Sequence, residues 1–318
     1  MSAPLLEING LKKYFGIGGN MKKGAVKAVD DVSFKVYEGE TLGIVGESGC
    51  GKSTVGRLVL RLLDLTGGEI KFNGVSIGDW SQRQLRPIRK DMQCVFQDPY
   101  ASLNPRITVG KAIAEPLIVQ TGMSRSEAMK RAEELLETVG LRAQSARLYP
   151  HEFSGGQRQR IAIARAVSLG PKLIVADEPV SALDVSIQAQ IVNLLGELQE
   201  KTKVSYLFIS HNLSVVRHIS DRVAVMYLGQ IVETASRDQL FESPKHPYTQ
   251  ALLSSVPEPA IDGRRERIIL SGEVPNAANP PSGCAFHPRC PHAAERCRTE
   301  KPAFRELEPG HFASCHFI

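Results

Sequence analysis

The sequence predicts an α/β fold, in which helices cover both faces of a sheet of parallel strands. Short apolar runs alternate along the chain with segments whose apolar residues recur at helical spacing, which is typical of α/β layering. Leu173–Ala176 is apolar at every position, as expected of a strand buried on both faces, and Val204–Ile209 is a second such strand. Thr41–Gly46 is a third apolar run, and it leads directly into a glycine-rich loop.

Amphipathic helices are expected after two of these strands. Behind the glycine-rich loop, one helical face is formed by Val55, Leu58, Val59, Leu62 and Leu63. A second helical stripe precedes the strand at Val204 and consists of Ile187, Ile191, Leu194, Leu195 and Leu198.

Local signals predict two more elements. Ser124 and Glu127 have the spacing of a capping box that opens a polar helix, and Gly140 ends that helix. Val223–Tyr227 and Gln230–Glu233 are joined through a glycine and predict a β-hairpin.

Size and composition indicate a globular protein with one large domain or two unequal ones. The chain has 318 residues, of which 42% are hydrophobic and 23% are charged. No apolar run approaches the roughly 20 residues of a membrane helix. The N-terminus lacks the basic and apolar regions of a secretory signal. The net charge of +5 is modest and gives no reason to expect nucleic acid as a partner.

The character of the sequence changes after Val256. Seven prolines fall between Pro257 and Pro291, with little hydrophobic periodicity. We therefore predict a main domain over 1–256, with a helical subdomain over about 100–165, followed by a linker and small appendage over 257–318. An appendage this short needs an additional constraint, such as a bound metal, to hold a fold.

Residues 46–53 match the phosphate-binding loop pattern and stand between a strand and a helix, as that pattern requires. The glycines let backbone N–H groups converge on phosphate oxygens, and the helix N-terminus adds its positive dipole. Lys52 is predicted to reach the β- and γ-phosphates, and the Ser53 hydroxyl to ligate Mg²⁺. The predicted ATP-binding residues are Gly46, Glu47, Ser48, Gly49, Cys50, Gly51, Lys52, Ser53 and Thr54.

Two adjacent acidic residues follow the strand Leu173–Ala176. Asp177 is predicted to hold Mg²⁺ through water, and Glu178 to orient or deprotonate the attacking water as a general base. In a chain with a phosphate-binding loop, this pair indicates nucleotide hydrolysis.

A third motif lies between the other two, where residues 153–157 read Phe-Ser-Gly-Gly-Gln. With these motifs in this order, the chain resembles the ATP-binding cassette (ABC) transporter family from about residue 5 to the C-terminus. The resemblance implies an ABC-type P-loop NTPase domain with a helical subdomain, an antiparallel β subdomain and a small cysteine-rich appendage. It also implies that one segment touches the nucleotide held by a second subunit. That segment consists of Ser154, Gly155, Gly156 and Gln157. Leucine is commoner in the family at the position of Phe153.

The resemblance implies roles for residues that carry little signal alone. Gln97 matches the loop glutamine that contacts Mg²⁺ and senses the membrane subunit. Asp184, at the end of Ser-Ala-Leu-Asp, matches the loop through which two ATPase subunits communicate. His211 matches the histidine that contacts the γ-phosphate. The aromatic residue that stacks on adenine is Tyr14 or Phe15, and the sequence leaves both open.

Some ABC ATPases act on nucleic acid or ribosomes instead of transporting, and a soluble ATPase of that kind is the alternative function. The chain lacks the long coiled coils or zinc modules of the DNA-repair members and the second ATPase domain of the translation members. Three segments, Gln97–Pro105, His246–Leu252 and Asn279–Cys284, resemble the peptide/nickel importers, and Ser210–Ser214 resembles their F-type ATPase subunit.

This narrower resemblance implies a set of partners and a location. The expected partners are a paralogous ATPase subunit in a heterodimer, two transmembrane permease subunits and, indirectly, an extracytoplasmic solute-binding protein; nucleic acid is not expected. A permease helix is expected to dock near Tyr100–Pro105. The chain is then expected to be peripheral to the cytoplasmic face of a bacterial inner membrane. There it is expected to hydrolyse ATP as the motor subunit of an importer for oligopeptides, dipeptides or a related solute.

The appendage contains four cysteines, Cys284, Cys290, Cys297 and Cys315. Four thiolates are enough for a tetrahedral zinc ion or a [4Fe–4S] cluster, although zinc sites usually have more closely spaced cysteine pairs. In the peptide importers this pattern is associated with an iron–sulfur cluster, which the resemblance therefore implies; zinc and four reduced thiols remain alternatives. Four histidines nearby are substitute ligands or, more simply, surface imidazoles: His287, His292, His311 and His316.

Overall fold

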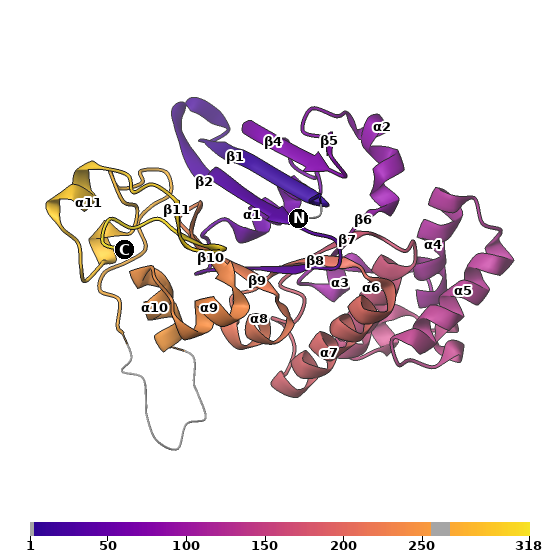
Figure 1. The fold of residues 1–318 in the computed structure, drawn as a ribbon. Helices are drawn as coiled ribbons and strands as arrows, with labels where there is room; N and C mark the ends of the chain where they lie inside the picture. The colour runs from indigo at the N-terminus through magenta and orange to yellow at the C-terminus, as the bar shows by residue number, and fades with distance from the viewer. Residues whose placement is uncertain (1–2, 256–267) are drawn as a thin grey trace, which may run out of the picture. The chain divides into compact units, whose positions relative to one another are not determined.

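The computed structural model describes residues 3–255 and 268–318, and the chain divides into two compact units (Figure 1). The first unit comprises 1–36, 41–78 and 210–318, and the second comprises 37–40 and 79–209. Both units contain strands and helices, so the predicted α/β class is confirmed. Within the described residues, no helix combines the length and the apolar character that crossing a bilayer demands.

An antiparallel sheet forms the N-terminal part of the first unit. Its strands are β1 (Leu6–Ile17), β2 (Asn20–Val36), β4 (Gly67–Phe72) and β5 (Val75–Ser76), in the order β2-β1-β4-β5. They are drawn in indigo and purple in Figure 1. Leu6 and Ile8 of β1 are buried because alternate side chains point to the same face of a strand, and Leu11 is buried after a shift in register. The expected antiparallel β subdomain is therefore present.

The second sheet of this unit carries the glycine-rich loop. β3 (Thr41–Val45) is buried at every position and pairs in parallel with β9 (Arg222–Tyr227). A two-residue turn joins β9 to β10 (Gln230–Ser236), and both turn residues, Leu228 and Gly229, have positive φ of 44° and 80°. Such turns match the twist of the flanking strands, so the predicted hairpin is confirmed.

The helix after the glycine-rich loop is shorter than the apolar spacing predicts. α1 runs over Lys52–Val59, and Arg61 has a positive φ of 51°. The Arg61 guanidinium then donates to the carbonyl oxygens of Ile77 and Leu63, at 3.2 and 2.9 Å. The prediction that Leu62 belongs to the buried stripe is wrong, because it is 50% exposed beyond this helix end.

The C-terminal segment extends the same sheet. β12 (His311–Ala313) pairs antiparallel with β10 and with β11 (Arg305–Glu308). The other regular elements are α8 (Leu213–Ile219), α9 (Arg237–Glu242), α10 (Pro247–Ser254), a 3₁₀ turn at His287–Arg289 and α11 (Glu295–Thr299). The predicted linker after Val256 falls mostly outside the described residues, and the domain limits remain predictions.

The sheet of the second unit is parallel. Its strands are β6 (Met92–Val95), β7 (Leu173–Asp177) and β8 (Ser205–Ile209), in the order β8-β7-β6. β7 and β8 are buried at every position, which confirms the prediction from their apolar runs. The helix between them, α7 (Val185–Thr202), buries four residues of its predicted stripe: Ile191, Leu194, Leu195 and Leu198.

Helices dominate the rest of the second unit. α4 (Val109–Thr121), α5 (Arg125–Thr138) and α6 (Gly155–Val167) contact one another and are accompanied by short α2 (Gln82–Leu85) and α3 (Pro99–Ser102). Three 3₁₀ turns, Arg86–Lys90, Ala143–Arg147 and Pro150–Glu152, connect them. The capping box of Ser124 and Glu127 opens α5 as predicted, and Gly140 follows the helix with a φ of 76°.

Candidate active site

The glycine-rich loop between β3 and α1 has a backbone that only glycine permits. A Cβ atom on Gly46 would lie 2.1 Å from the carbonyl oxygen of Met226. A Cβ atom on Gly51, where φ is 108°, would lie 2.1 Å from the carbonyl oxygen of Ala28. Backbone therefore packs directly against the loop, which can turn its N–H groups toward an anion as the pattern predicts.

Lys52 is folded back over this loop. Its side chain is buried, and its Nζ donates to the carbonyl oxygens of Gly46 and Glu47 at 2.7 and 3.0 Å. Burial raises the pKa of the neighbouring Cys50 thiol, so that thiol stays protonated. The carbonyl oxygen of Cys50 accepts the N–H of Gly229 at 2.9 Å. Cys50 thus contributes its backbone to the loop.

Glu47, the second residue of the loop, has partners that the sequence did not indicate. Its N–H donates to the Tyr248 hydroxyl oxygen at 2.9 Å. Its carboxylate accepts two hydrogen bonds from the Arg289 guanidinium, at 2.8 and 3.1 Å. Ser48 and Gly49 are exposed, whereas Ser53 and Thr54 are half-buried at the start of α1. No sequence motif links positions 47 and 289, so this pair could be found only in the folded chain.

The two candidate adenine-stacking residues differ in their surroundings. The Tyr14 hydroxyl donates to Asp30 Oδ1 at 2.5 Å, and burial together with this bond raises the pKa of Tyr14 to about 12. The N–H of Asp30 donates to the carbonyl oxygen of Gly229, in the turn that also contacts Cys50. Phe15 is 40% exposed and, as the next residue in β1, points to the opposite face.

His211 is far from the loop in sequence, but its neighbour in the chain is bonded to the strand that leads into the loop. The preceding N–H, of Ser210, donates to the carbonyl oxygen of Ile44 at 3.1 Å, two residues before Gly46. The following residue, Asn212, caps α8 with its side-chain oxygen. His211 is therefore an exposed side chain between two fixed backbone positions of the first unit.

In the second unit, Gln97 follows the end of β6, and Asp177 is the last residue of the neighbouring parallel strand β7. Val95 of β6 pairs with Ala176 of β7, so both side chains lie at the carboxyl edge of this sheet, where ligands of α/β proteins bind. Asp177 is 7% exposed, whereas Gln97 is exposed.

Glu178 has an unusual backbone for a residue with a side chain. Its φ is 50°, in the left-handed region. Its N–H donates to the carbonyl oxygen of Ile209 at 2.9 Å, and its own carbonyl oxygen accepts from the N–H and the hydroxyl of Ser181. These bonds hold a conformation that is costly for glutamate, which is a common feature of functional positions.

The Ser-Gly-Gly-Gln segment forms the first turn of α6. Ser154 is the N-cap, its hydroxyl accepts the N–H of Gln157, and the Gln157 side chain accepts the N–H of Ser154. Both side chains are exposed. A Cβ atom on Gly156 would lie 2.5 Å from Ile187 Cγ2, so α7 packs where a side chain would otherwise stand. Phe153 is 7% exposed and anchors the turn.

The neighbouring loop ends at Asp184, the N-cap position of α7. Its side chain is exposed and makes no capping hydrogen bond with the helix. Leu183 packs beside Gly155, because a Cβ atom there would lie 3.5 Å from Leu183 Cδ2. The loop and the Ser-Gly-Gly-Gln turn are therefore adjacent within the second unit.

The four C-terminal cysteines are near one another but do not form an evident metal centre. The N–H of Cys284 donates to the carbonyl oxygen of Cys297 at 2.8 Å. Burial first, and the other three thiols to a smaller extent, raise the pKa of Cys284 to about 11. In the part of the chain that the structure describes, no group of three or more His, Cys, Asp and Glu side chains is arranged to hold a metal ion. The predicted iron–sulfur cluster and its zinc alternative are not confirmed.

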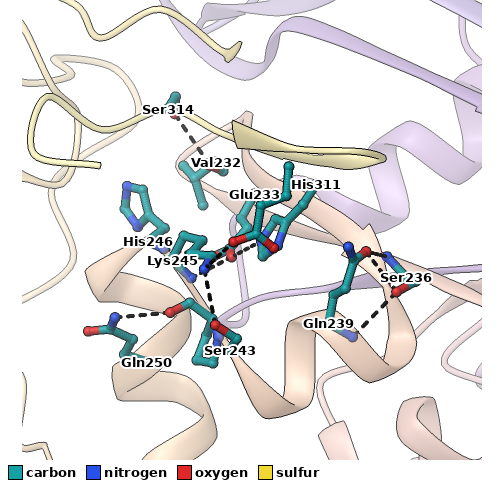
Figure 2. A network of polar contacts seen from close by, with 12 residues as sticks. Val232, Glu233, Ser236, Gln239, Ser243, Lys245, His246, Gln250, His311 and Ser314 are labelled. Carbon is teal, nitrogen blue, oxygen red and sulfur yellow. Dashed lines mark hydrogen bonds and ion pairs between the residues drawn. The ribbon is translucent and has the colours of Figure 1, made fainter. Parts of the chain in front are cut away.

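One of the histidines in this segment is not a surface imidazole. His311 is fully buried, and its Nε2 lies 2.7 Å from Glu233 Oε1 in β10 (Figure 2). Glu233 also accepts the N–H groups of Lys245 and His246. The prediction of a surface group is therefore wrong for His311, because β12 joins the sheet and carries its side chain into the unit. His292 is exposed as predicted.

Comparisons with known proteins give the family. Residues 29–181 match the model "ABC transporter", and residues 232–297 match "Oligopeptide/dipeptide transporter, C-terminal region". The chain is 57% identical over 318 residues to the oligopeptide transport ATP-binding protein AppF of Bacillus subtilis, covering 98% of this chain and 97% of that one. It is 52% identical over 312 residues to a putative peptide import ATP-binding protein of Brucella ovis, covering 98% and 97%.

Solved structures agree with this relation. The dimeric post-hydrolysis structure of the ATP-binding cassette MJ0796, bound to ADP and Pi, is 31% identical with a TM-score of 0.66, covering 73% of this chain and 98% of that one. CbiO1 of Clostridium perfringens, part of an ABC transporter complex, is 26% identical with a TM-score of 0.67, covering 76% and 92%. The predicted ABC-type fold is confirmed, and the chain belongs to the ABC transporter family, among the ATP-binding proteins of oligopeptide transport.

Proposed function

We propose that this chain is the ATP-hydrolysing motor subunit of an importer for oligopeptides or dipeptides. The observation that carries this proposal is the match of residues 232–297 to the oligopeptide/dipeptide transporter C-terminal region, in a chain with a complete phosphate-binding loop. Two relatives that match the chain over almost their whole length are named as peptide transport or peptide import proteins. No observation favours the alternative, an ATPase that acts on nucleic acid or ribosomes.

The first unit is proposed to bind the nucleotide. The loop N–H groups and the N-terminus of α1 contact the phosphates, and the Lys52 ammonium moves from the loop carbonyl oxygens to the β- and γ-phosphates. Tyr14 is the proposed adenine platform instead of Phe15, because its hydrogen bonds run through Asp30 to the turn that contacts Cys50. His211 is proposed to contact the γ-phosphate.

Mg²⁺ is the proposed metal cofactor, and the available donors suit it. The Ser53 hydroxyl, the buried Asp177 carboxylate and the Gln97 amide all offer oxygen, which Mg²⁺ prefers. When bound, Mg²⁺ neutralises charge that develops on the phosphate oxygens. Glu178 then orients a water molecule and takes its proton, held in place by its bonded backbone.

Hydrolysis is proposed to need a second subunit. The first turn of α6 exposes Ser154 and Gln157 at the positive end of a helix, which suits contact with a partner's γ-phosphate. A paralogous ATPase subunit in a heterodimer is the proposed partner, and Asp184 lies in the loop proposed to connect the two subunits. Two permease subunits, an extracytoplasmic solute-binding protein and a peripheral position on the cytoplasmic face of the inner membrane complete the proposal.

The four cysteines are proposed to hold a [4Fe–4S] cluster. Support comes from the number of thiols, which is what such a cluster needs, and from the bond between the backbones of Cys284 and Cys297. Iron and acid-labile sulfide are measured on the anaerobically purified full chain. Stoichiometric zinc without iron would replace the proposal with a zinc site, and neither metal would leave four reduced thiols.

The function is tested in the assembled complex. Glu178→Gln is expected to keep ATP binding and lose turnover, because the general base is gone while the phosphate contacts remain. Glu197→Gln, which removes an exposed carboxylate from α7, is the matched control and keeps full turnover. Undiminished hydrolysis by Glu178→Gln would refute the assignment of the base. Purification in mild detergent tests the partners: polytopic membrane proteins support the transporter, and recovery of only RNA or DNA refutes it.

A further inference from the structure

One ion pair connects the C-terminal segment, residues 268–318, to the phosphate-binding loop. The two Nη atoms of Arg289 donate to the two carboxylate oxygens of Glu47 at 2.8 and 3.1 Å. The Arg289 side chain is 8% exposed and that of Glu47 is 27% exposed. Bidentate pairs of this kind are stronger and more directional than ordinary hydrogen bonds, particularly when shielded from water. The pair therefore fixes where the Glu47 carboxylate points.

Every polar group of Glu47 is held. Its N–H donates to the hydroxyl of Tyr248, a fully buried residue of α10, and its carbonyl oxygen accepts from Lys52 Nζ. That carbonyl oxygen also accepts the N–H of Cys50 at 3.3 Å. Two of the four partners of Glu47, Tyr248 and Arg289, come from the part of the chain after the ATPase motifs. The position of the loop thus depends on Tyr248 and Arg289, which are 201 and 242 positions away from Glu47 in sequence.

Arg289 is itself rigidly placed. It ends the 3₁₀ turn that precedes Cys290, and its N–H donates to the carbonyl oxygen of Phe286 at 3.0 Å. Phe286 is buried against Tyr227 and Tyr248, with ring centroids 5.3 and 5.4 Å away. The guanidinium lies 6.0 Å from the Tyr227 ring centroid. An arginine with so little freedom loses little entropy on binding Glu47.

The segment has separate anchors elsewhere. His311 is bonded to Glu233 of β10, and the N–H of Ser314 donates to the carbonyl oxygen of Val232 (Figure 2). The carbonyl oxygen of Ala277 accepts the N–H of Lys27 in β2 at 3.1 Å. Because these contacts do not involve the loop, loss of the Arg289 guanidinium should leave the segment in place.

We propose that Arg289 is a positioning residue of the ATP site, which acts from the C-terminal segment through Glu47. Without Arg289, the Glu47 carboxylate would stand unneutralised in the loop that receives the negatively charged phosphates, and like charges so close repel. With Arg289, that charge is neutralised and the loop is fixed in its binding conformation. This role rests on the proposed binding of ATP at the loop.

The test compares ATP affinity in the purified full chain, measured by calorimetry with Mg²⁺ and ATP. Arg289→Gln is expected to weaken ATP binding about tenfold, the scale of one charge-assisted bidentate contact. Adding Glu47→Gln is expected to restore affinity to within about threefold of the wild type, since the unneutralised charge is then gone. Arg296→Gln is the matched control, because it removes an arginine of the same segment whose exposed pair with Glu300 is remote from the loop.

Further readouts separate positioning from a merely structural role. In the assembled complex, Arg289→Gln is expected to raise the KM for ATP about tenfold and to change kcat by less than about twofold. Arg289→Lys keeps the positive charge but cannot donate two parallel hydrogen bonds to the Glu47 carboxylate, so this variant should bind ATP with intermediate affinity. This variant also provides the test if Arg289→Gln fails to fold, as shown by its melting temperature without nucleotide.

Two outcomes would overturn the proposal. One is wild-type ATP affinity in Arg289→Gln, or in Arg289→Lys where only that variant folds. The other is a double variant that binds ATP as weakly as Arg289→Gln alone. Failure of the proposed ATP binding at the loop gives a different result, since the wild-type chain itself would then not bind ATP.

Discussion

His246 is a buried neutral histidine, and its protonation should destabilise the fold at mildly acidic pH. It is 1% exposed, and its Nδ1 accepts the N–H of Tyr248 as the N-cap of α10. Burial lowers its pKa from 6.5 to about 4, although the nearby Glu233 carboxylate acts in the opposite direction. This residue and Glu233 lie in the same network (Figure 2).

The size of the effect follows from the two pKa values. The unfolded chain takes up a proton near pH 6.5 and the folded chain only near pH 4, so the unfolded state binds more protons between these values. The contribution of neutral His246 to stability is therefore fully present above about pH 6.5 and is lost as the pH falls toward 4. Between pH 7 and pH 5, the loss from this group is about 2 kcal/mol.

His246→Asn tests this explanation. An asparagine oxygen can replace Nδ1 as the cap acceptor but does not titrate in this range. Urea unfolding at pH 5, 6 and 7 should show that the variant loses about 2 kcal/mol less stability between pH 7 and pH 5 than the wild type. His151→Asn, which removes an exposed imidazole, should keep the wild-type pH dependence. Equal pH dependence in the wild type and His246→Asn would refute the reasoning.

Two other substitutions follow from local geometry. Gly156→Ala should place a methyl group against Ile187 and destabilise the second unit by about 1–3 kcal/mol, measured by urea unfolding. Adding Ile187→Ala to this variant should recover part of the lost stability. If no stability is recovered, packing against Ile187 is not the reason that glycine is required. Ser124→Ala should lower the free energy of unfolding by about 1 kcal/mol through loss of the α5 cap. Ser126→Ala, at the exposed second residue of the same helix, should change it by less than about 0.5 kcal/mol. An equal effect of the two serine substitutions would contradict the capping explanation.

The sequence was most informative where the signal was local. The buried strands β7 and β8, the capping box at Ser124 and the hairpin at Gly229 each depend on residues a few positions apart, and each was predicted correctly. The end of α1 was missed because it depends on Arg61, whose guanidinium reaches Ile77 in a different part of the chain. Apolar spacing carries no information about such a contact, so it extended the stripe to Leu62.

In the candidate site, too, local features were predictable from the sequence and long-range contacts were not. Its motif residues are recognisable because each motif is contiguous, and the structure adds the reasons for particular types, such as the close backbone approach at Gly46 and Gly51. Residues that support the motifs were not predictable. Arg289 and Glu47 are separated by 242 positions, and His311 and Glu233 by 78. The second of these pairs exists only once β12 has joined the sheet beside β10.

These two long-range pairs also bear on what the C-terminal segment is for. A segment needed only to bind a cluster could be fixed by the sheet pairing of β12 and by Glu233 and His311, all remote from the loop. The Arg289–Glu47 contact is not required for that purpose, yet its two side chains are only 8% and 27% exposed. Arg289 adjoins Cys290, so this contact connects the chain beside that cysteine directly to the phosphate-binding loop. Arg289→Gln removes that connection while the anchors at β10 remain, so ATP affinity and the stability of the segment should change independently.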